Sequence, residues 1–403
     1  MQPTNIQIDQ DWLVQPGVQD VIQALTNDGG IARFVGGCVR DAMFHRPIRD
    51  IDIATDQTPD QVIALLDKAG LKHAPTGLAH GTVTAIAAGQ GFEVTTLRVD
   101  EETDGRRAKV SFTDDWLVDA QRRDFTMNAL YCDADGTVYD PVGGIDDIAT
   151  HRVRFIGDAD ARIKEDYLRI LRFFRFHAWY GQGTILDPQG LAACGDHKDG
   201  MEILSIERIR SEFLRLLESS DPAAALWPMQ KVGILSLILP VEPDLIALEK
   251  LVAREQAADM LSAHRRLAIL FSANLQSLGR HASNWKMSNA KKKRLRSMAK
   301  NCDVSAMDAA SARAAIYRKG KQVFVDDLIL WSDQINLDLL RLSQDWAVPT
   351  FPIAGDDVMT LGVAAGREVG DLLQSLEDYW VDQDFGPDRD ALLGRLPGML
   401  ARQ

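Results

Sequence analysis

The sequence predicts an α+β protein in which an N-terminal head with a small mixed sheet is followed by an all-helical remainder. Between residues of about 30 and 155, short β-branched runs alternate with Gly-rich turns, which is typical of strands. From Ala161 onward, nearly every segment has the apolar spacing of a helix. A chain of 403 residues is also too long for one ordinary core, so several domains are expected.

The strands of the head are predicted from segments that alternate between apolar and polar residues and are bounded by Gly or Asp. In chain order these segments are ARFVGG, RDIDIAT, GTVTAIAAG, FEVTTLRV, ALYCDADGTVYDPVGG and HRVRFIG. Within the fifth segment, YCDADGTVYD has an Asp-Gly turn between two apolar arms, which predicts a hairpin. Between the strands, a helix is predicted from Pro59 to Gly70.

The helical remainder begins with IKEDYLRILRFFRFHAWY, SIERIRSEFLRLLE and AAALWPMQKVGILSLIL and continues in long stretches after Asp244. A Gly-rich segment from Tyr180 to Gly200 is expected to be a loop or a broken helix. The change from strand-like to helical patterns along the chain predicts three parts. These are a head over residues 1–150, a helical neck over residues 151–220, and a helical body and tail over residues 221–403.

Composition excludes several classes of protein. With 46 % hydrophobic and 26 % charged residues, the chain is expected to be globular rather than disordered or fibrous. The apolar stretch from Val232 to Leu239 is far too short to span a membrane, and MQPTNIQIDQDW has no feature of an export signal. The cysteines are scattered without a CxxC pair, which favours a reducing, cytoplasmic location and argues against a disulfide framework or structural zinc. They are Cys38, Cys132, Cys194 and Cys302.

The net charge of −13 argues against binding of nucleic acid, because phosphate contacts need cations. The distribution of charge matters more than its sum, however. From Lys286 to Lys300 the chain has seven cations and no acid, and EDYLRILRFFRF contributes three more arginines. A solvated helix face is the plainer interpretation of the first cluster taken alone. Two local cationic surfaces nevertheless keep RNA binding compatible with an acidic protein.

Two carboxylates in a strand-like segment suggest a metal site. Side chains alternate between the faces of a strand, so Asp50 and Asp52 are predicted to project from the same face, a few ångströms apart. Two such carboxylates repel each other unless a cation lies between them, and a hard oxygen site suits Mg²⁺. Bound magnesium ions neutralise a triphosphate in phosphoryl transfer. Alone, a DxD motif is weak, since most such acids lie at exposed strand ends or in turns.

A Gly pair upstream suggests a phosphate site. Gly36 and Gly37 follow the apolar strand from Ile31 to Val35, and glycines at this position let backbone N–H groups approach a phosphate closely. Arg40, one helical turn later, can add a charge-assisted contact. A plain strand-to-helix turn is the commoner role of a Gly pair. The order of a phosphate-binding turn and then an acid pair favours the functional interpretation.

A series of motifs in one order resembles a known family. GGCVRD, RDIDIAT, HGTV, FEVTTLR, RRDFTMNALYCD, DPVGG and EDYLRILRFFRF are similar to motifs of the class II tRNA nucleotidyltransferases. These are the CCA-adding enzymes and bacterial poly(A) polymerases of the polymerase β-like nucleotidyltransferase superfamily. The motifs extend from about Gly36 to Glu218. FPIAGDDVMTLGVAAGREVGDLL is a weaker match near the C-terminus, although the family often has Pro where Arg367 stands.

The resemblance implies roles for the head residues. Asp50 and Asp52 would hold catalytic Mg²⁺, while Gly36, Gly37 and Arg40 would hold the incoming triphosphate.

Glu93 in FEVTTLR would be a third catalytic acid, unless it only pairs with Arg98 or another cation. In RRDFTMNA, Arg123 would contact the nucleotide, with Asp124 and Asn128 near the ribose. A buried acceptor and amide suit an enzyme that must recognise a 2′-hydroxyl. Asp124 is also expected to cap a helix that begins at Phe125.

The neck motif EDYLR implies selection of the base. On one continuous helix Asp166 and Arg169 would be neighbours at positions i and i+3, and together they can recognise a base edge as a pairing partner does. In the resembling family this pair is a protein template for CTP and ATP. Arg172 and Arg175 would continue toward the nucleotide or the tRNA end. The alternative is an exposed helix in which Glu165 pairs with Arg169.

Outside the pocket residues, the resemblance implies supporting roles. Glu207 and Arg208 match positions that brace the neck helix, and His80 in its turn is given no catalytic role. The body and tail would hold tRNA through phosphate contacts rather than through base recognition. The candidates for these contacts are Lys291, Lys292, Lys293 and Arg294.

The activity implied is addition of CMP and AMP, from CTP and ATP, to the 3′ end of tRNA with release of pyrophosphate. A bacterial poly(A) polymerase is less favoured, because KAGLKHAPTGLAHGTVTAIAAG lacks the GRRFRLAHV-like signature of those enzymes. An enzyme that adds only CC or only A remains open, since these differ in a flexible loop, here assigned to Asp100 to Phe112.

Two further alternatives come from other classes of protein. An inactive scaffold that binds RNA would be marked by loss of Asp50 or Asp52, and both are present. A small-molecule nucleotidyltransferase would explain the head motifs but not EDYLR or the long helical body. No His-Asp dipeptide occurs, so no metal-dependent phosphohydrolase activity is predicted.

Overall fold

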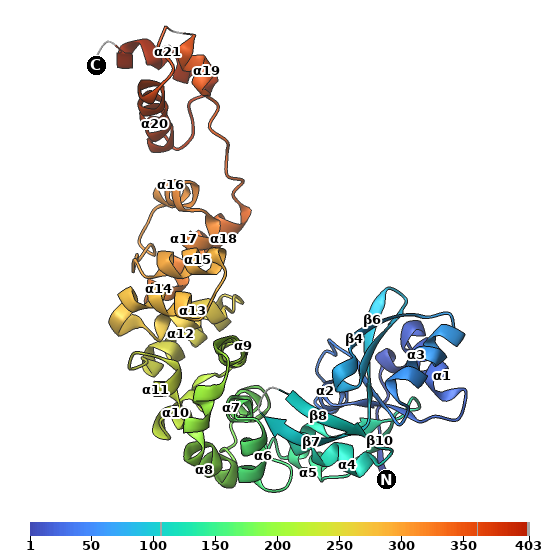
Figure 1. The fold of residues 1–403 in the computed structure, drawn as a ribbon. Coiled ribbons are helices and arrows are strands. Elements are labelled where there is room, and N and C mark those ends of the chain that lie inside the picture. The colour runs from blue at the N-terminus through green and yellow to red at the C-terminus, as the bar shows by residue number, and fades with distance from the viewer. Residues whose placement is uncertain (105–106, 361, 401–403) are drawn as a thin grey trace. The chain divides into compact units, whose positions relative to one another are not determined.

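A computed structural model describes residues 1–104, 107–360 and 362–400 and divides the chain into two compact units (Figure 1). The first unit is Met1–Pro240 and the second is Val241–Gln403. The first unit contains the α+β head and the helices of the neck, whereas the described residues of the second form helices and connecting loops without strands. The fold class predicted from the sequence is therefore confirmed. The finer division at residues 150 and 220 stays a prediction.

The head is built on an eight-stranded sheet in the order β1-β10-β9-β2-β3-β6-β5-β4. The sheet is mixed because β3 and β6 pair in parallel, while the other neighbours pair antiparallel. The strands are β1 Pro3–Gln7, β2 Ala32–Val35, β3 Asp52–Thr55, β4 Lys72–Gly77, β5 Thr82–Ala87, β6 Gln90–Thr96, β9 Tyr131–Cys132 and β10 Thr137–Tyr139. The predicted hairpin is present, since β9 and β10 pair with Tyr131 opposite Tyr139.

Helices α1 (Pro16–Thr26) and α3 (Pro59–Lys68) pack on this sheet against β5 and β6. Helix α3 begins where the sequence predicts it, because Thr58 and Gln61 form a capping box ahead of Pro59. Its apolar stripe is buried together with residues of α1 and of the sheet, which covers that part of the sheet. The buried residues are Val18, Val21, Leu25, Val62, Leu66, Val83 and Phe92.

The strands of the head differ from the prediction in several places. The segment HRVRFIG forms no strand, since only an isolated bridge joins Phe155 to Phe125. Strands β1 and β4 were not predicted, because their exposed edge positions lack a buried apolar run. The segment predicted as a loop, from Asp100 to Phe112, includes residues 105–106, which lie outside the described part of the chain. On either side of them, β7 (Arg98–Asp104) and β8 (Arg107–Phe112) pair antiparallel.

The first unit contains further helices. They are α2 Gly37–Met43, α4 Trp116–Gln121, α5 Gly144–Ala149, α6 Ala159–Glu165, α7 Leu168–Tyr180, α8 Pro188–Asp196, α9 Ile206–Leu217, α10 Ala223–Lys231 and α11 Leu235–Ile238. Of these, α4 and α5 were not predicted, and α8 interrupts the segment Tyr180 to Gly200 that was expected to be a loop or a broken helix. An aromatic cluster packs α7 against the end of the head. Phe173 stacks on Phe155 at 5.4 Å between ring centroids, and Phe125 lies 5.1 Å from Phe176. Head and neck residues therefore share one core.

The second unit consists of helices α12 Leu245–Ala257, α13 Ala263–Ile269, α14 Leu275–Asn284, α15 Asn289–Met298, α16 Ala309–Lys319, α17 Lys321–Trp331, α18 Leu337–Asp345, α19 Gly355–Met359, α20 Arg367–Asp382 and α21 Arg389–Leu400. Its core includes an apolar cluster around Leu372, Leu376 and Trp380. No helix among the described residues is long and apolar enough to cross a membrane.

Candidate active site

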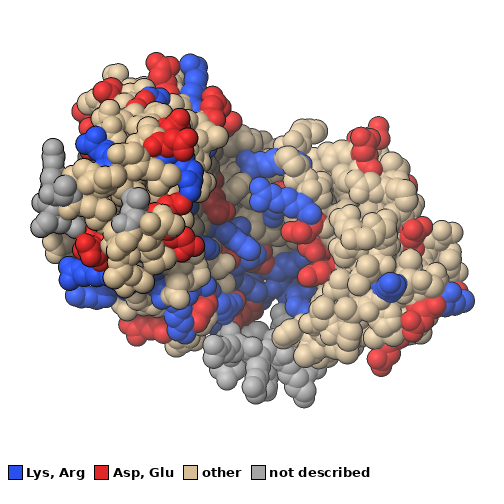
Figure 2. Space-filling view, turned by 90° about the horizontal axis from the view of Figure 1, so that it is seen from above, with Lys and Arg blue, Asp and Glu red and all other residues tan. Residues whose placement is uncertain are grey.

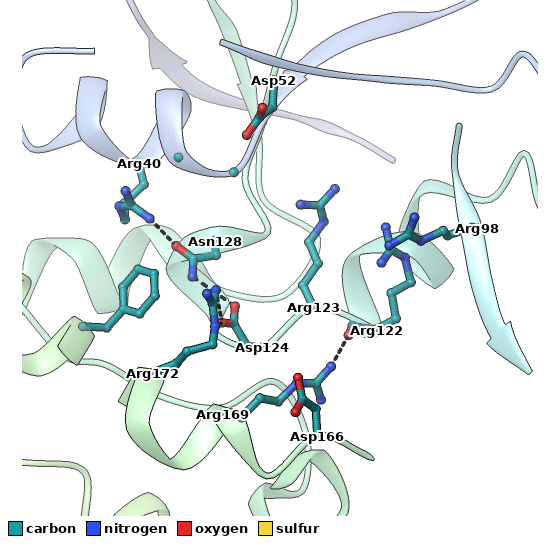
Figure 3. A pocket seen from close by; sticks show the side chains of 13 residues that line it. Arg40, Asp52, Arg98, Arg122, Arg123, Asp124, Asn128, Asp166, Arg169 and Arg172 are labelled. Atoms are coloured by element: carbon teal, nitrogen blue, oxygen red, sulfur yellow. Dashed lines mark hydrogen bonds and ion pairs between the residues drawn. The ribbon is translucent and has the colours of Figure 1, made fainter. Parts of the chain in front are cut away.

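A pocket of about 410 Å³ lies between the head and helix α7 of the neck, within the first unit. Its lining contains six arginines and three aspartates, so cations are in excess where a triphosphate would enter. The lining residues are Gly36, Gly37, Arg40, Asp52, Arg98, Arg122, Arg123, Asp124, Asn128, Asp166, Arg169, Arg172 and Phe176. Ten of these were predicted from the sequence. Figure 3 shows the labelled side chains converging from head and neck. Figure 2 shows that Lys and Arg are interspersed with Asp and Glu on the face in view.

The Gly pair forms the turn from β2 into α2. Gly36 has φ of +72°, a conformation that residues with a Cβ rarely adopt, and Gly37 begins the helix. Arg40 is 8 % exposed, and its Nη1 donates to Oδ1 of Asn128 at 2.7 Å. Its Nε and Nη2 lie 3.0 and 2.9 Å from Oδ1 of Asp41. The turn therefore has backbone groups and one fixed guanidinium beside the pocket.

The acids of the head lie at the start of the parallel pair of strands. Asp50 is exposed just before β3, Ile51 is buried, and Asp52 begins the strand and lines the pocket. Glu93 of β6 is the register partner of Asp52, so the third predicted acid is its neighbour across the sheet. Burial, Glu93 and Asp50 raise the pKa of Asp52 to about 6, although Arg123 and Arg40 oppose them. A bound cation would therefore stabilise the ionised carboxylate of Asp52, which burial and the neighbouring acids disfavour.

The acid pair fits a hard divalent cation. No three His, Cys, Asp or Glu side chains of the described ranges are gathered closely enough to hold a metal ion by themselves. Mg²⁺ differs from zinc in this respect, because it is usually held by one or two carboxylates together with water and substrate phosphates. Carboxylate oxygens of Asp50 and Asp52 are suitable donors, and the pocket beside Asp52 has room for phosphates.

A buried carboxylate that the sequence did not single out holds two pocket arginines. Asp119 of α4 is 1 % exposed and accepts from Nη2 of Arg123 at 2.9 Å and from Nε of Arg122 at 2.8 Å. It also accepts from the hydroxyl of Tyr131 at 2.7 Å. Burial raises the pKa of Asp119, but Arg123 and Arg122 outweigh burial and lower the pKa to about 2. In Figure 3 the guanidinium of Arg123 points toward Asp52.

Asp124 and Asn128 connect the head to α7. The Oδ2 atom of Asp124 accepts from Nε of Arg172 at 2.7 Å, and its Oδ1 accepts from Nδ2 of Asn128 at 3.0 Å. Burial raises the pKa of Asp124, but Arg172 and the amide of Asn128 lower it to about 2. The expected helix cap is wrong: Asp124 accepts from the N–H of Phe125, and Phe125 itself precedes the short helix Thr126–Asn128.

The neck motif departs from the predicted continuous helix. Asp166 has extended dihedral angles between α6 and α7, and its Oδ1 accepts from the N–H of Leu168, the first residue of α7, at 3.0 Å. Its Oδ2 accepts from Arg208 at 2.6 Å, in agreement with the bracing role predicted for Arg208. Arg169 lies 2.6 Å from Glu165, the ion pair of the plainer interpretation, and still lines the pocket. Asp166, between the two helices, and Arg169, in α7, therefore both line the pocket.

Comparison with known proteins decides the family. Residues 32–154 match the family described as Poly A polymerase head domain, and residues 185–245 match the one described as Probable RNA and SrmB- binding site of polymerase A. The chain is 34 % identical over 381 residues to the CCA tRNA nucleotidyltransferase 1, mitochondrial, of Danio rerio. The aligned residues cover 90 % of this chain and 86 % of the relative. The chain belongs to the class II tRNA nucleotidyltransferases.

Other members of this family agree in sequence and fold. A CCA-adding enzyme of Levilactobacillus brevis is 29 % identical over 384 residues, which are 93 % of this chain and 95 % of the relative. The crystal structure of the Bacillus stearothermophilus CCA-adding enzyme in complex with CTP matches with a TM-score of 0.78 at 27 % identity. That match covers 96 % of this chain and 99 % of the other. The family inferred from the motifs is confirmed, and its nucleotidyl transfer requires a divalent metal.

Three predicted residues of this nucleotidyltransferase lie outside the pocket lining: Asp50, Glu93 and Arg175. Glu93 pairs with Asp52 across the sheet, and Asp50 lies two residues before Asp52, outside β3. Arg175 instead donates through Nε to the buried Glu212 of α9 at 2.6 Å, so its side chain contacts another helix of the neck. The expectation that Arg175 faces the nucleotide is therefore not supported by its position.

Three lining residues were missed, namely Arg98, Arg122 and Phe176. Each lies inside a motif that was recognised, FEVTTLR, RRDFTMNA or EDYLRILRFFRF, so the family motifs carried the signal. Arg98 also donates to the carbonyl of His80, which gives that turn a structural contact.

The predicted RNA-binding cluster divides within α15. Lys291 and Lys293 are exposed and Lys292 is half-buried. Arg294 is different, because its Nε and Nη2 donate to the buried carboxylate of Asp326 at 2.7 and 2.8 Å. Arg294 is therefore engaged within the second unit by Asp326, and its contact with RNA stays a prediction.

Proposed function

We propose that this chain adds CMP and then AMP, from CTP and ATP, to the 3′ end of tRNA and releases pyrophosphate. The observation that carries the proposal is one pocket lined both by the phosphate-binding turn and acid of the head and by Asp166 and Arg169 of the neck. A small-molecule nucleotidyltransferase would need only the first set. The names of the relatives, CCA tRNA nucleotidyltransferase and CCA-adding enzyme, support the same activity.

Charge in the pocket explains how the head would act on the triphosphate. Asp50 and Asp52 would hold Mg²⁺, which supplies charge neutralisation on the phosphates and on the reacting oxygens. The backbone of Gly36 and Gly37 and the guanidinium of Arg40 would bind phosphate oxygens from the other side. Arg123 would balance negative charge near Asp52, because Asp119 holds it in place.

Selection between the bases would belong to the neck. A carboxylate can accept from the exocyclic amine of cytosine or adenine, and a guanidinium can donate to the ring acceptors. Arg169 is held by Glu165 and also donates to the carbonyl of Arg122 at 3.0 Å, so its position depends on both head and neck. Asp124 and Asn128, both buried beside the pocket, are suited to recognise a ribose hydroxyl.

The exposed lysines of α15 would contribute phosphate contacts to tRNA. Lys291 and Lys293 are exposed and no acid lies between Lys286 and Lys300, which favours binding that weakens with salt. The double change Lys291→Ala and Lys293→Ala is expected to weaken tRNA binding about uniformly across sequences. Filter binding over a salt series measures it, and an unchanged affinity and salt slope would contradict the assignment.

A cytoplasmic location is also proposed, on the ground of scattered cysteines with no disulfide pattern. The Danio rerio relative is mitochondrial by name, so the location needs its own test. Fractionation of the source cells with an antibody to the chain would decide it, and recovery of the protein in an organelle or in the extracellular medium would contradict the proposal.

Incorporation by the purified protein with Mg²⁺ tests the function. The substrates are tRNA ending before CCA, tRNA ending in CC and an unstructured RNA, each with CTP, ATP or both. Two C additions followed by one A establish CCA addition. Addition of only CC, or of A only to the CC-ended tRNA, identifies a partial enzyme, while long A tails identify a poly(A) polymerase.

The acid pair provides the control for this assay. Asp52→Ala is expected to abolish incorporation of every nucleotide and to leave tRNA binding largely intact, because Asp52 belongs to the head pocket and not to the cationic helix. Full activity in this variant would remove the metal hypothesis. Absence of incorporation by the unaltered chain would favour the inactive RNA-binding scaffold.

A further inference from the structure

The guanidinium of Arg40 is held by the protein in one plane. Three of its donors are committed: Nε and Nη2 to Oδ1 of Asp41, and Nη1 to Oδ1 of Asn128. A Cβ atom placed on Gly37 would be 3.7 Å from Nη2, so this edge of the fork lies beside the Gly turn. A guanidinium has five N–H groups in a fixed fork, and its orientation therefore decides which ones face the pocket.

One side chain of the neck contacts both Arg40 and its carboxylate. The Cζ atom of Arg40 lies 4.4 Å from the ring centroid of Tyr180, at the end of α7, and 5.1 Å from that of Phe176. The hydroxyl of Tyr180 donates to Oδ1 of Asp41 at 2.8 Å, the same oxygen that accepts from Arg40. Tyr180 is 6 % exposed, so these contacts are made away from solvent, where they are stronger.

We propose that Tyr180 is a positioning residue for the triphosphate: its ring holds the plane of Arg40 and its hydroxyl holds Asp41. The proposal rests on the proposed function, because it takes Arg40 as a phosphate ligand. A neck helix would then set the geometry of the phosphate site in the head. Since CTP and ATP have the same triphosphate, loss of Tyr180 must affect both nucleotides equally, unlike loss of a residue that selects the base.

The remaining neighbours of Tyr180 define the purely structural alternative. The Cζ atom of Arg46 lies 4.6 Å from the ring centroid of Tyr180, and the ring centroid of Phe44 lies 5.1 Å from it. If Tyr180 only joined neck to head through these contacts, its loss would lower the thermal stability. The nucleotide KM and the affinity for free polyphosphate would then not change.

The test compares Tyr180→Phe, which keeps the ring, with Tyr180→Leu, which removes ring and hydroxyl. We expect the KM for CTP and for ATP to rise together, about threefold in Y180F and about tenfold in Y180L, as loss of one hydrogen bond and one stacking contact predicts. The kcat at saturating nucleotide and the KM for tRNA should stay within about twofold of the parent. The affinity for inorganic tripolyphosphate, measured by calorimetry without tRNA, should fall by the same factors.

The matched control is Trp179→Phe on the same helix. Trp179 donates through its indole N–H to the carbonyl of Arg215 at 2.7 Å, so the variant also loses one hydrogen bond of an α7 aromatic residue without touching Arg40. It should leave nucleotide KM and tripolyphosphate affinity unchanged.

Either an unchanged tripolyphosphate affinity in folded Y180L or a KM effect limited to one nucleotide overturns the proposal. If Y180L does not fold, Y180F decides it, because the ring and its packing are kept. If the parent chain incorporates no nucleotide, the proposed function fails. The tripolyphosphate affinities of parent and variant still decide the role of Tyr180, since that measurement needs no reaction.

Discussion

Replacing Asp119 by Asn tests whether one buried carboxylate supports the arginines of the pocket. The substitution keeps the shape of the side chain but removes the charge that faces Arg122 and Arg123. One amide oxygen can still accept a hydrogen bond, whereas the amide NH₂ now meets a guanidinium or the hydroxyl of Tyr131. Two arginines whose side chains are 16 % and 19 % exposed then lose their buried counter-ion.

The expected loss of stability follows from two estimates. The pKa of Asp119 is lowered from 3.8 to about 2, which at about 1.4 kcal/mol per pH unit amounts to about 2 kcal/mol in favour of the ionised folded state. Removing one partner of a buried ion pair typically costs about 3 to 5 kcal/mol. A loss of about 3 kcal/mol is therefore expected, or a fall in Tm of about 6–12 °C for a unit of this size.

The pH dependence has a definite sign. Since the folded pKa is below the unfolded one, the stabilisation is complete above pH of about 4 and is lost as the pH falls through the folded pKa near 2. Differential scanning calorimetry of parent and D119N at pH 7 and at pH 3 measures both effects, and the difference between the two proteins should shrink at low pH.

The matched control is Asp28→Asn, which removes an exposed ion pair to Lys68. A surface pair of this kind contributes between about 0 and 1 kcal/mol. If D119N unfolded within about 0.5 kcal/mol of the parent, as the surface control should, the reasoning about buried compensation of Arg122 and Arg123 would be refuted.

Three other outcomes are expected. Burial and Glu93 raise the pKa of Asp52 to about 6. The affinity for Mg²⁺ should therefore fall about tenfold per pH unit below pH of about 6 and level off above it. A calorimetric titration that shows the same affinity at pH 5 and pH 7 would contradict this. Arg169→Ala should blur discrimination between CTP and ATP more than it slows addition, and competition assays with full discrimination would exclude its role in base selection. Arg294→Ala should lower the Tm, because the buried carboxylate of Asp326 loses a counter-ion. Lys291→Ala should leave the Tm unchanged and weaken tRNA binding. The reverse pattern would support Arg294 as an RNA contact.

The sequence by itself determined what depends on neighbours along the chain. The Asp-Gly turn predicted the β9–β10 hairpin, and apolar periodicity predicted α3. Alternation also predicted that Asp50 and Asp52 project from one face of a strand-like segment, which stays a prediction. The order of the motifs also identified the family, and ten of the pocket residues followed from it. These signals are local, because turn, strand and cap preferences depend on a few consecutive residues.

Only the tertiary structure decided which side chains meet across distant segments. Asp119 resembles any helix acid in the sequence, and folding buries it beneath Arg122 and Arg123. Arg294 looks like its exposed lysine neighbours until Asp326 of another helix neutralises it. The register of β3 and β6 likewise sets Glu93 beside Asp52. The free energy of a buried charge depends on its partner and on its exposure to water, and neither is fixed before the helices and strands have packed.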